Sequence, residues 1–92
     1  MYLHLGKDVI VPLREVVAIL DARFVRASEM NQAFLRRAAE AGQLRGEGLT
    51  DAKSIVVTTR GLYASPVSSK TLARRIRTHW WLEVLQAETR SR

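Results

Sequence analysis

Residues 53–76 read Lys-Ser-Ile-Val-Val-Thr-Thr-Arg-Gly-Leu-Tyr-Ala-Ser-Pro-Val-Ser-Ser-Lys-Thr-Leu-Ala-Arg-Arg-Ile, and this stretch decides the fold. Its first part, 54–59, is rich in β-branched side chains, which favour a strand. Arg60-Gly61 interrupts the pattern and residues 62–65 resume it, so a hairpin with Gly61 at a positive φ is expected. Pro66 then ends the second strand, because its nitrogen cannot donate a hydrogen bond to a neighbouring strand.

A basic helix is predicted directly after this hairpin. Ser68 or Ser69 can accept a hydrogen bond from the first free amides of that helix. An apolar stripe at i+4 spacing follows, formed by Leu72, Ile76, Trp80 and Val84. The other faces carry the cations Lys70, Arg74, Arg75 and Arg77. Because no acidic residue occurs between Ala52 and Leu82, the hairpin, the cap and the helix form one basic unit.

The N-terminal part of the chain predicts three more strands. Residues 2–5 and 9–11 are strand-like and are joined by a turn, which indicates a hairpin. Pro12 ends it, and Leu13–Glu15 is long enough for one helical turn only. Residues 16–20 are almost wholly apolar, which predicts a central strand buried on both faces.

One helix is predicted in the middle of the chain, after a connection over 21–27. Ser28 is a good N-cap and Gly42 a natural stop. An apolar stripe is expected to face the core and consists of Met30, Phe34, Ala38 and Ala41. Residues 45–51, with two glycines, are expected to form a mobile loop. The order is β-β-turn-β-α-β-β-α, which predicts an α+β domain, a small hairpin-built sheet with two helices.

Length and composition set limits on the class of protein. A chain of 92 residues forms one domain, which we expect over 1–88 with a frayed tail at 89–92. The absence of cysteine excludes disulfides and thiolate metal sites and fits a reducing compartment. No apolar run reaches the ~20 residues that span a bilayer, and the N-terminus lacks the order of a signal peptide. The expectation is a cytoplasmic protein that does not bind a membrane.

The charge balance favours an anionic partner. Fifteen Lys and Arg against nine Asp and Glu give a net charge of +6, and all but three of the fifteen cations are Arg. The planar guanidinium matches phosphate oxygens with two hydrogen bonds, which suits nucleic acid.

The sequence offers little for catalysis. His4 and His79 are the two histidines, and their spacing does not fit a metal pair. The carboxylates are scattered, and there is no glycine-rich phosphate loop or nucleophile motif. We therefore expect no enzyme activity, no cofactor and no metal.

Two features of the C-terminal region have competing interpretations. The cluster of Arg74, Arg75 and Arg77 is either a solvated helix face or a phosphate-binding surface. The missing acidic partners, and a cation in the first helical turn, favour the second interpretation. Trp81 and Leu85 extend the apolar surface beyond the stripe, which favours self-association over a base-stacking platform.

Three segments resemble the bacterial extracellular-matrix regulators of the RemA/RemB family, with RemB-type members the closer match. They are Met-Tyr-Leu-His-Leu-Gly at 1–6, Val-Pro-Leu-Arg-Glu-Val-Val-Ala-Ile-Leu-Asp at 11–21, and the segment Lys-Ser-Ile-Val-Val-Thr with the following Tyr-Ala-Ser-Pro-Val-Ser-Ser-Lys-Thr-Leu within 53–72. The resemblance implies a LytTR-like subunit, a ring-shaped homo-oligomer and binding to double-stranded DNA that activates matrix genes. By the same resemblance, Arg14 matches a DNA-contacting arginine.

The expected DNA-binding residues are Arg14, Lys53, Arg60, Lys70, Arg74 and Arg75. The sequence departs from the family at Thr50-Asp51, where RemA-like members carry an Arg-Arg pair before the Ile-Val-Val strand. This departure keeps a second hypothesis open, an oligomeric interaction protein of the same fold with weak or no DNA binding, which assembles with a RemA-type partner. RNA binding is a third possibility.

Overall fold

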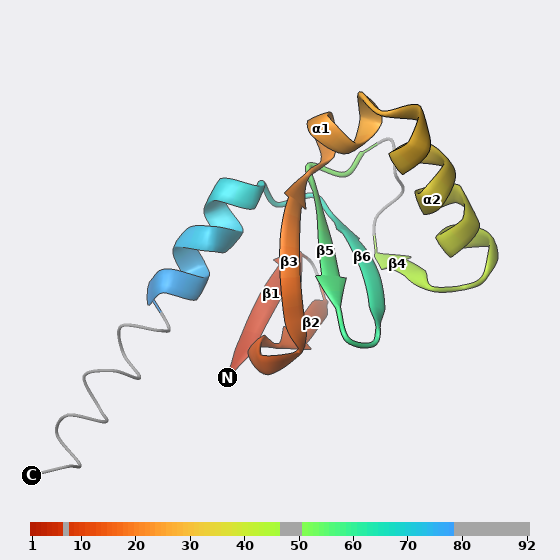
Figure 1. Ribbon diagram of the computed structural model, residues 1–92. Helices are drawn as coiled ribbons and strands as arrows, with labels where there is room; N and C mark the ends of the chain where they lie inside the picture. Colours follow the sequence, from red (N-terminus) through yellow and green to blue (C-terminus); the bar gives the residue numbers. More distant parts are fainter. Residues whose placement is uncertain (7, 47–50, 79–92) are drawn as a thin grey trace, which may run out of the picture.

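The computed structural model describes residues 1–6, 8–46 and 51–78 of the chain (Figure 1). It has two small sheets. β1 (Tyr2–Gly6) and β2 (Val9–Pro12) pair antiparallel as an N-terminal hairpin. The second sheet has four strands in the order β3-β5-β6-β4, namely β3 (Val16–Asp21), β5 (Ser54–Thr58), β6 (Gly61–Ser65) and β4 (Leu44–Gly46). β3, β5 and β6 are antiparallel neighbours, whereas β4 runs parallel to β6.

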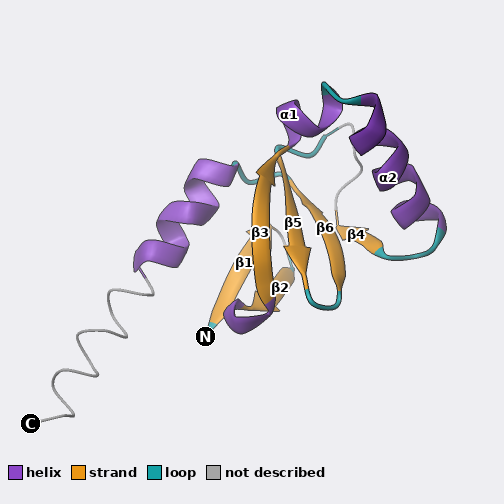
Figure 2. Cartoon of the chain, in the orientation of Figure 1, coloured by secondary structure: helices purple, strands orange, loops and turns teal. Residues whose placement is uncertain are grey.

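The helical segments join and cover these sheets (Figure 2). A short 3-10 helix, η1 (Leu13–Glu15), joins the hairpin to β3. Two α-helices, α1 (Ala22–Arg26) and α2 (Glu29–Glu40), lie between β3 and β4. A helix follows β6, and the structure describes it over residues 69–78. The architecture is therefore α+β, as the sequence predicts.

The four-stranded sheet separates two apolar clusters, because successive side chains of a strand point to opposite faces. Ile55 of β5 belongs to the cluster that includes Val25 and Leu35 of the α1–α2 layer. Its neighbour Val56 belongs to the opposite cluster, with Leu3, Leu5 and Val11 of the N-terminal hairpin and Leu72 of the last helix. The sheet is thus the middle layer, with α1 and α2 on one face and the hairpin and the last helix on the other.

The hairpins and helix caps are confirmed. The Ser28 Oγ accepts from the Asn31 amide at 3.3 Å, and the Ser68 Oγ accepts from the Thr71 amide at 3.2 Å. Gly61 has a φ of +142° and is the first residue of β6, so the turn itself is Thr59-Arg60. A Cβ on Gly61 would lie 2.8 Å from the Gln43 carbonyl oxygen, so the approach to β4 also requires glycine.

The predicted position of residues 16–20 is wrong. β3 is an edge strand, and its side chains are only partly covered; Val17 remains 65% exposed. The N-terminal hairpin forms a sheet of its own instead of pairing with β3, which leaves one edge of β3 without a strand partner among the described residues. A register shift between Val16 and Ala18 turns Val17 away from the ladder. An apolar run alone does not distinguish a central strand from an apolar edge strand, which has a neighbouring strand on one side only.

The predicted inward face of α2 is also wrong in part. Leu35 and Ala38 are buried, whereas Met30 and Phe34 are 83% and 59% exposed. The chain enters α2 from α1, a helix that the sequence analysis treated as a connection, and this entry sets which side of α2 meets the sheet. Asp21 is the local signal for α1, because its carboxylate accepts from the Arg23 amide at 2.9 Å as an N-cap.

The loop predicted over 45–51 begins with a strand instead. Leu44, Arg45 and Gly46 pair with Leu62, Tyr63 and Ala64 of β6, so the hydrogen bonds come from residues distant in sequence. The rest of that loop at 47–50, Trp80, Trp81, Leu85 and the tail 89–92 lie outside the described residues.

Candidate nucleic-acid interface

The η1 turn and the β5–β6 turn meet at one end of the sheet. The Thr59 amide donates to the Glu15 carbonyl oxygen at 2.9 Å. The Arg60 Nε lies 3.0 Å from the Glu15 Oε1, and the Glu15 side chain is only 15% exposed. This contact brings Arg14 and Arg60 to the same end of the molecule, although 45 residues of sequence separate Glu15 from Arg60. It also places a carboxylate on Arg60, one of the expected DNA-binding residues.

Arg14 is exposed, and a surface ion pair with Glu15 or Asp21 is the alternative to a contact with DNA. Glu15 pairs with Arg60, and Asp21 pairs with Arg23 at 2.8 Å. Within the described residues, neither ion pair includes Arg14. The surface ion pair of Arg14 is therefore not formed among the described residues, and Asp21 lies at the opposite end of β3 from the η1 turn.

The Asp21–Arg23 pair has an electrostatic consequence. The Arg23 guanidinium donates to the carboxylate from Nε at 3.2 Å and from Nη2 at 2.8 Å. These hydrogen bonds hold the pKa of Asp21 below its usual range. The same pairing raises the pKa of Arg23. Both charges are thus satisfied by each other rather than by an outside partner.

Lys53 lies at the opposite end of β5. Its amide donates to the Ser65 carbonyl oxygen at 2.8 Å, and its own carbonyl oxygen accepts from Ala22 at 3.1 Å, so its backbone is held at the top of the sheet. Its side chain is exposed, and so is that of Asp51 two residues earlier. Five strand residues at ~3.4 Å each put about 17 Å between Lys53 and the turn that carries Arg60.

The last helix supplies the third group of cations. Lys70 and Arg74 are exposed and stand four residues apart, so they share a helix face. Arg75 is exposed as well, and its Nη1 donates to the His4 carbonyl oxygen of β1 at 3.0 Å. That bond fixes the Arg75 side chain against the hairpin and leaves its charge uncompensated.

The six predicted residues therefore form three groups in one copy of the chain, at the η1 turn, at the start of β5 and on the last helix. The sequence could not reveal the bonds of Arg60 and Arg75, because their partners lie far away along the chain. Among the described residues, no group of three His, Asp or Glu side chains is arranged to hold a metal ion. None of the helices in the described ranges is both long and apolar enough to cross a membrane.

Comparison with known proteins shows which family the chain belongs to. A sequence model of the family described as RemA-like, extracellular matrix regulatory protein A-like, matches residues 2–76. The chain belongs to this family. The RemA-like match includes every element from β1 to the last helix up to Ile76, and all six candidate cations. It ends before the two tryptophans.

A curated member of this group agrees with the assignment. The extracellular matrix regulatory protein B of Bacillus subtilis (strain 168) is 39% identical over 75 residues, which cover 82% of this chain and 89% of that protein. The resemblance to RemA/RemB proteins expected from the sequence segments is confirmed at the level of the family.

Proposed function

We propose that this RemA-like protein is a DNA-binding transcriptional regulator of extracellular-matrix genes that acts as a homo-oligomer and catalyses no reaction. The observation that supports it most directly is Arg14, an exposed cation next to Glu15, whose carboxylate is engaged by Arg60. An exposed guanidinium on a short, backbone-held turn suits a phosphate oxygen. The LytTR-like relationship of the subunit is part of the same proposal.

Oligomerisation is needed for this arrangement to bind firmly. One copy presents a few cations in three separate groups, and a single phosphate contact is weak at physiological salt. A ring repeats the Arg14 group in every subunit, so that each bound subunit raises the effective concentration of the next one near the duplex. The proposal therefore predicts strong dependence on both salt and assembly.

The test is a titration of duplex DNA at several salt concentrations with the full chain. Each neutralised phosphate contributes about −0.9 to the slope of log K against log salt, so a ring with several contacts gives a steep line. A flat line contradicts phosphate binding. Competition by duplex RNA of equal length separates DNA from RNA, since RNA that competes equally contradicts the DNA assignment.

A second candidate function follows from two acidic side chains. Asp51 is exposed close to Lys53, and Glu15 neutralises Arg60, so two of the six candidate cations stand beside a carboxylate. These features favour an interaction protein of the same fold that assembles with a RemA-type partner and binds DNA weakly. Native mass spectrometry of a mixture tests it, because tight DNA binding by this chain alone, without any hetero-complex, contradicts this alternative.

A further inference from the structure

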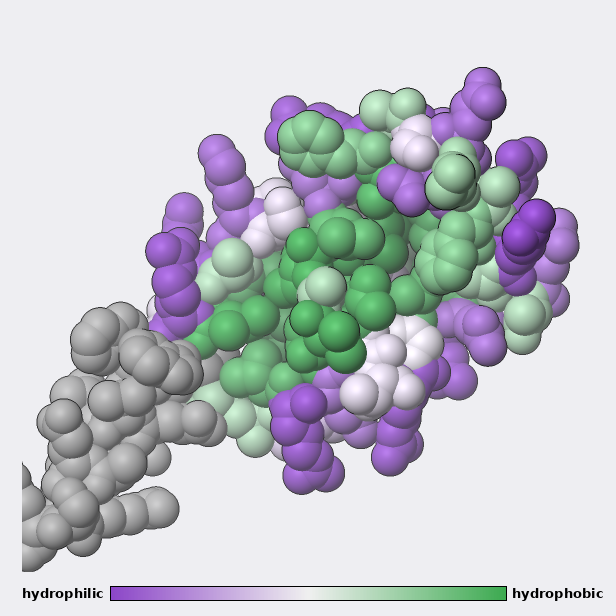
Figure 3. Space-filling view, viewed as in Figure 1, coloured by the Kyte–Doolittle hydropathy of each residue, from purple (hydrophilic) through white to green (hydrophobic). Residues whose placement is uncertain are grey.

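An apolar groove lies between the α1–α2 layer and the sheet. Leu20 of β3 and Phe34 of α2 remain 43% and 59% exposed, and they line a small hollow together with Val25, Leu35 and Ile55. In the view of Figure 3, apolar side chains run continuously across this face of the molecule. A protein with no partner at this face would keep these side chains in contact with water.

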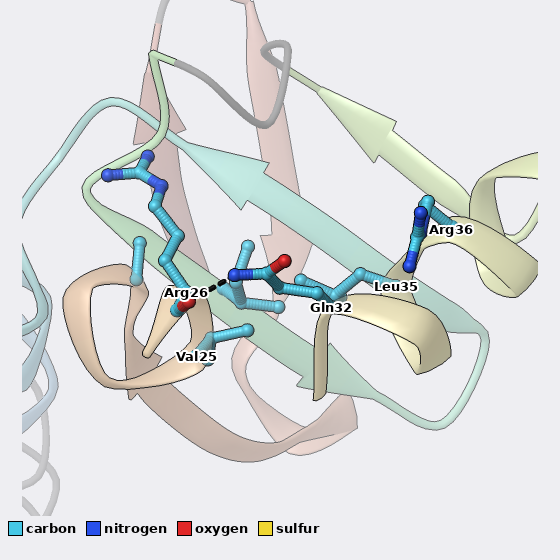
Figure 4. Close-up of a pocket in the computed structure, with 7 residues that line it drawn as sticks. Val25, Arg26, Gln32, Leu35 and Arg36 are labelled. Carbon is cyan, nitrogen blue, oxygen red and sulfur yellow. Dashed lines mark hydrogen bonds between the residues drawn. The ribbon is translucent and has the colours of Figure 1, made fainter. Parts of the chain in front are cut away.

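A larger cavity of about 290 Å³ lies beside this groove and shares three lining residues with it. Val25, Leu35 and Ile55 line both hollows, and Ala22 completes the apolar wall (Figure 4). Gln32 donates to the Arg26 carbonyl oxygen along one border. Arg36 lines the cavity from α2 and is exposed, so a positive charge lies at the border of this cavity.

The chain beyond the last described helix has the complementary composition. Of residues 79–87, six are apolar, including the adjacent Trp80 and Trp81, and Glu83 is the single charged residue. Such a segment offers two large aromatic anchors and one negative charge. The family match ends at residue 76, so this segment is a feature of this chain beyond the matched family core.

The described end of the last helix lies on the side of the sheet opposite to the groove of the same copy (Figure 1). Leu72 packs on the hairpin face, opposite to the cluster of Val25 and Leu35. In Figure 1 the last helix runs away from the sheet, and its described end lies on the opposite side of β3 from α2. Three residues reach ~10 Å beyond Thr78, whereas two packed layers separate the faces by about 20 Å.

We propose that residues 80–85 of one copy bind in the apolar groove of a second copy. The inference rests on the oligomeric part of the proposed function and names the surfaces that form it. Tryptophans inserted in a desolvated pocket are typical anchors of an interface, and an indole beside Arg36 gains a cation–π contact. The contact is head-to-tail, and such contacts close into a ring when the rotation between copies permits it.

Two single variants of the full chain test the contact from its two sides. Phe34→Lys puts a charge in the groove at an exposed position, and Trp81→Ser removes an anchor from the segment. Phe24→Lys is the matched control, because Phe24 is 74% exposed and lines neither hollow. We expect Phe34→Lys and Trp81→Ser each to raise the concentration for half-assembly at least tenfold in sedimentation velocity, and Phe24→Lys to leave it unchanged.

Mixing the variants distinguishes a second copy from self-docking. Phe34→Lys retains an intact segment and Trp81→Ser an intact groove, so an equimolar mixture should form a one-to-one dimer that neither variant forms alone. Fluorescence energy transfer between labelled variants measures it. Absence of the mixed dimer, or unchanged assembly in both variants, overturns the inference.

The outcome is independent of DNA binding. If Phe34→Lys assembles and binds duplex DNA like the unmodified protein, this inference fails and the proposed function stands. If the unmodified protein assembles through the groove and binds no DNA, the proposed function fails and the inference stands.

Discussion

The two basic regions of the molecule differ in what their arginines contact. At the η1 turn Arg14 is exposed and Glu15 engages Arg60, whereas the Asp21–Arg23 pair lies at the other end of β3, where Asp21 is paired with Ser54. On the last helix, Lys70 and Arg74 are exposed, and Arg75 bonds to a carbonyl oxygen, which fixes its position but does not neutralise it. A count of cations in the sequence treats these regions as equal. The contacts show that the helix keeps more net positive charge, whereas the turn presents one isolated guanidinium.

Comparing the variants Arg14→Ala and Arg74→Ala decides which of the two basic regions contacts DNA. If the turn is the contact surface, Arg14→Ala should lower DNA affinity at least tenfold, because every subunit of the oligomer loses a phosphate contact at once. The change should leave thermal unfolding unaltered, since the side chain is exposed and has no ion pair among the described residues. DNA titration and melting of both variants measure this. Loss of binding in Arg74→Ala alone would move the contact surface to the last helix.

The variant Glu15→Gln tests the η1 turn by adding net positive charge to it instead of removing a cation. Removing the carboxylate frees the charge of Arg60 beside Arg14, so we expect DNA affinity to rise a few-fold and the salt slope to steepen by about one. The lost ion pair costs up to about 1 kcal/mol of folding stability. Unchanged affinity would mean that the turn does not approach DNA. Asp51→Asn is the matched control, since it removes a carboxylate near Lys53, at the other end of β5.

The variant Arg75→Ala tests whether the hydrogen bond of Arg75 stabilises the folded protein, which is a separate question from DNA binding. The lost hydrogen bond to the His4 carbonyl oxygen should lower the free energy of unfolding by about 0.5–1.5 kcal/mol, measured by denaturant titration. Arg74→Ala on the neighbouring position, which lacks such a bond to the hairpin among the described residues, should change it less. Equal effects of the two variants would show that the Arg75 bond does not hold the helix on the hairpin.

Acid sensitivity gives the smallest expected effect. The pKa of Asp21 is lowered in the folded protein, so the ionised carboxylate adds stability above its unfolded pKa of about 3.9. That contribution disappears as the pH falls through the lower folded pKa. Asp21→Asn keeps a good N-cap but loses the ionic bond to Arg23, so its acid unfolding curve should be flatter below pH ~4. A curve identical to that of the unmodified protein contradicts a stabilising Asp21–Arg23 pair.

Local signals predicted those parts of the fold that local chemistry determines. Pro66, Ser68 and Gly61 act within a few residues, and the hairpin and the cap form where they indicate. The strand β3 and the helix α2 form where the sequence predicts them, but the position of β3 in the sheet and the buried face of α2 were predicted wrongly, because their surroundings come from elsewhere in the chain. Phe34 lies in the apolar stripe that periodicity identifies, yet the fold buries Leu35 instead. Phe34, which was expected to be buried and is exposed, is one of the residues that line the apolar groove.

The candidate site was likewise predicted only where its residues do not depend on contacts with distant parts of the chain. Exposure of Arg14, Lys53 and Arg74 agrees with their assignment as surface cations. The neutralisation of Arg60 by Glu15 depends on two turns that meet only in the folded protein, so no spacing in the sequence encodes it. Electrostatic partners across such distances become visible only in three dimensions.

The buried hydroxyl of Ser65 has a consequence for the order in which the chain folds. It donates to the Leu5 carbonyl oxygen at 2.5 Å and accepts from the Val67 amide at 3.0 Å, joining residues 60 positions apart. A two-stranded hairpin is marginally stable alone, and Leu3 and Leu5 find their apolar neighbours in Val56 and Leu72. During synthesis the first hairpin therefore remains unsupported until almost the whole domain has left the ribosome. We therefore expect the first hairpin to become ordered together with β5, β6 and the last helix.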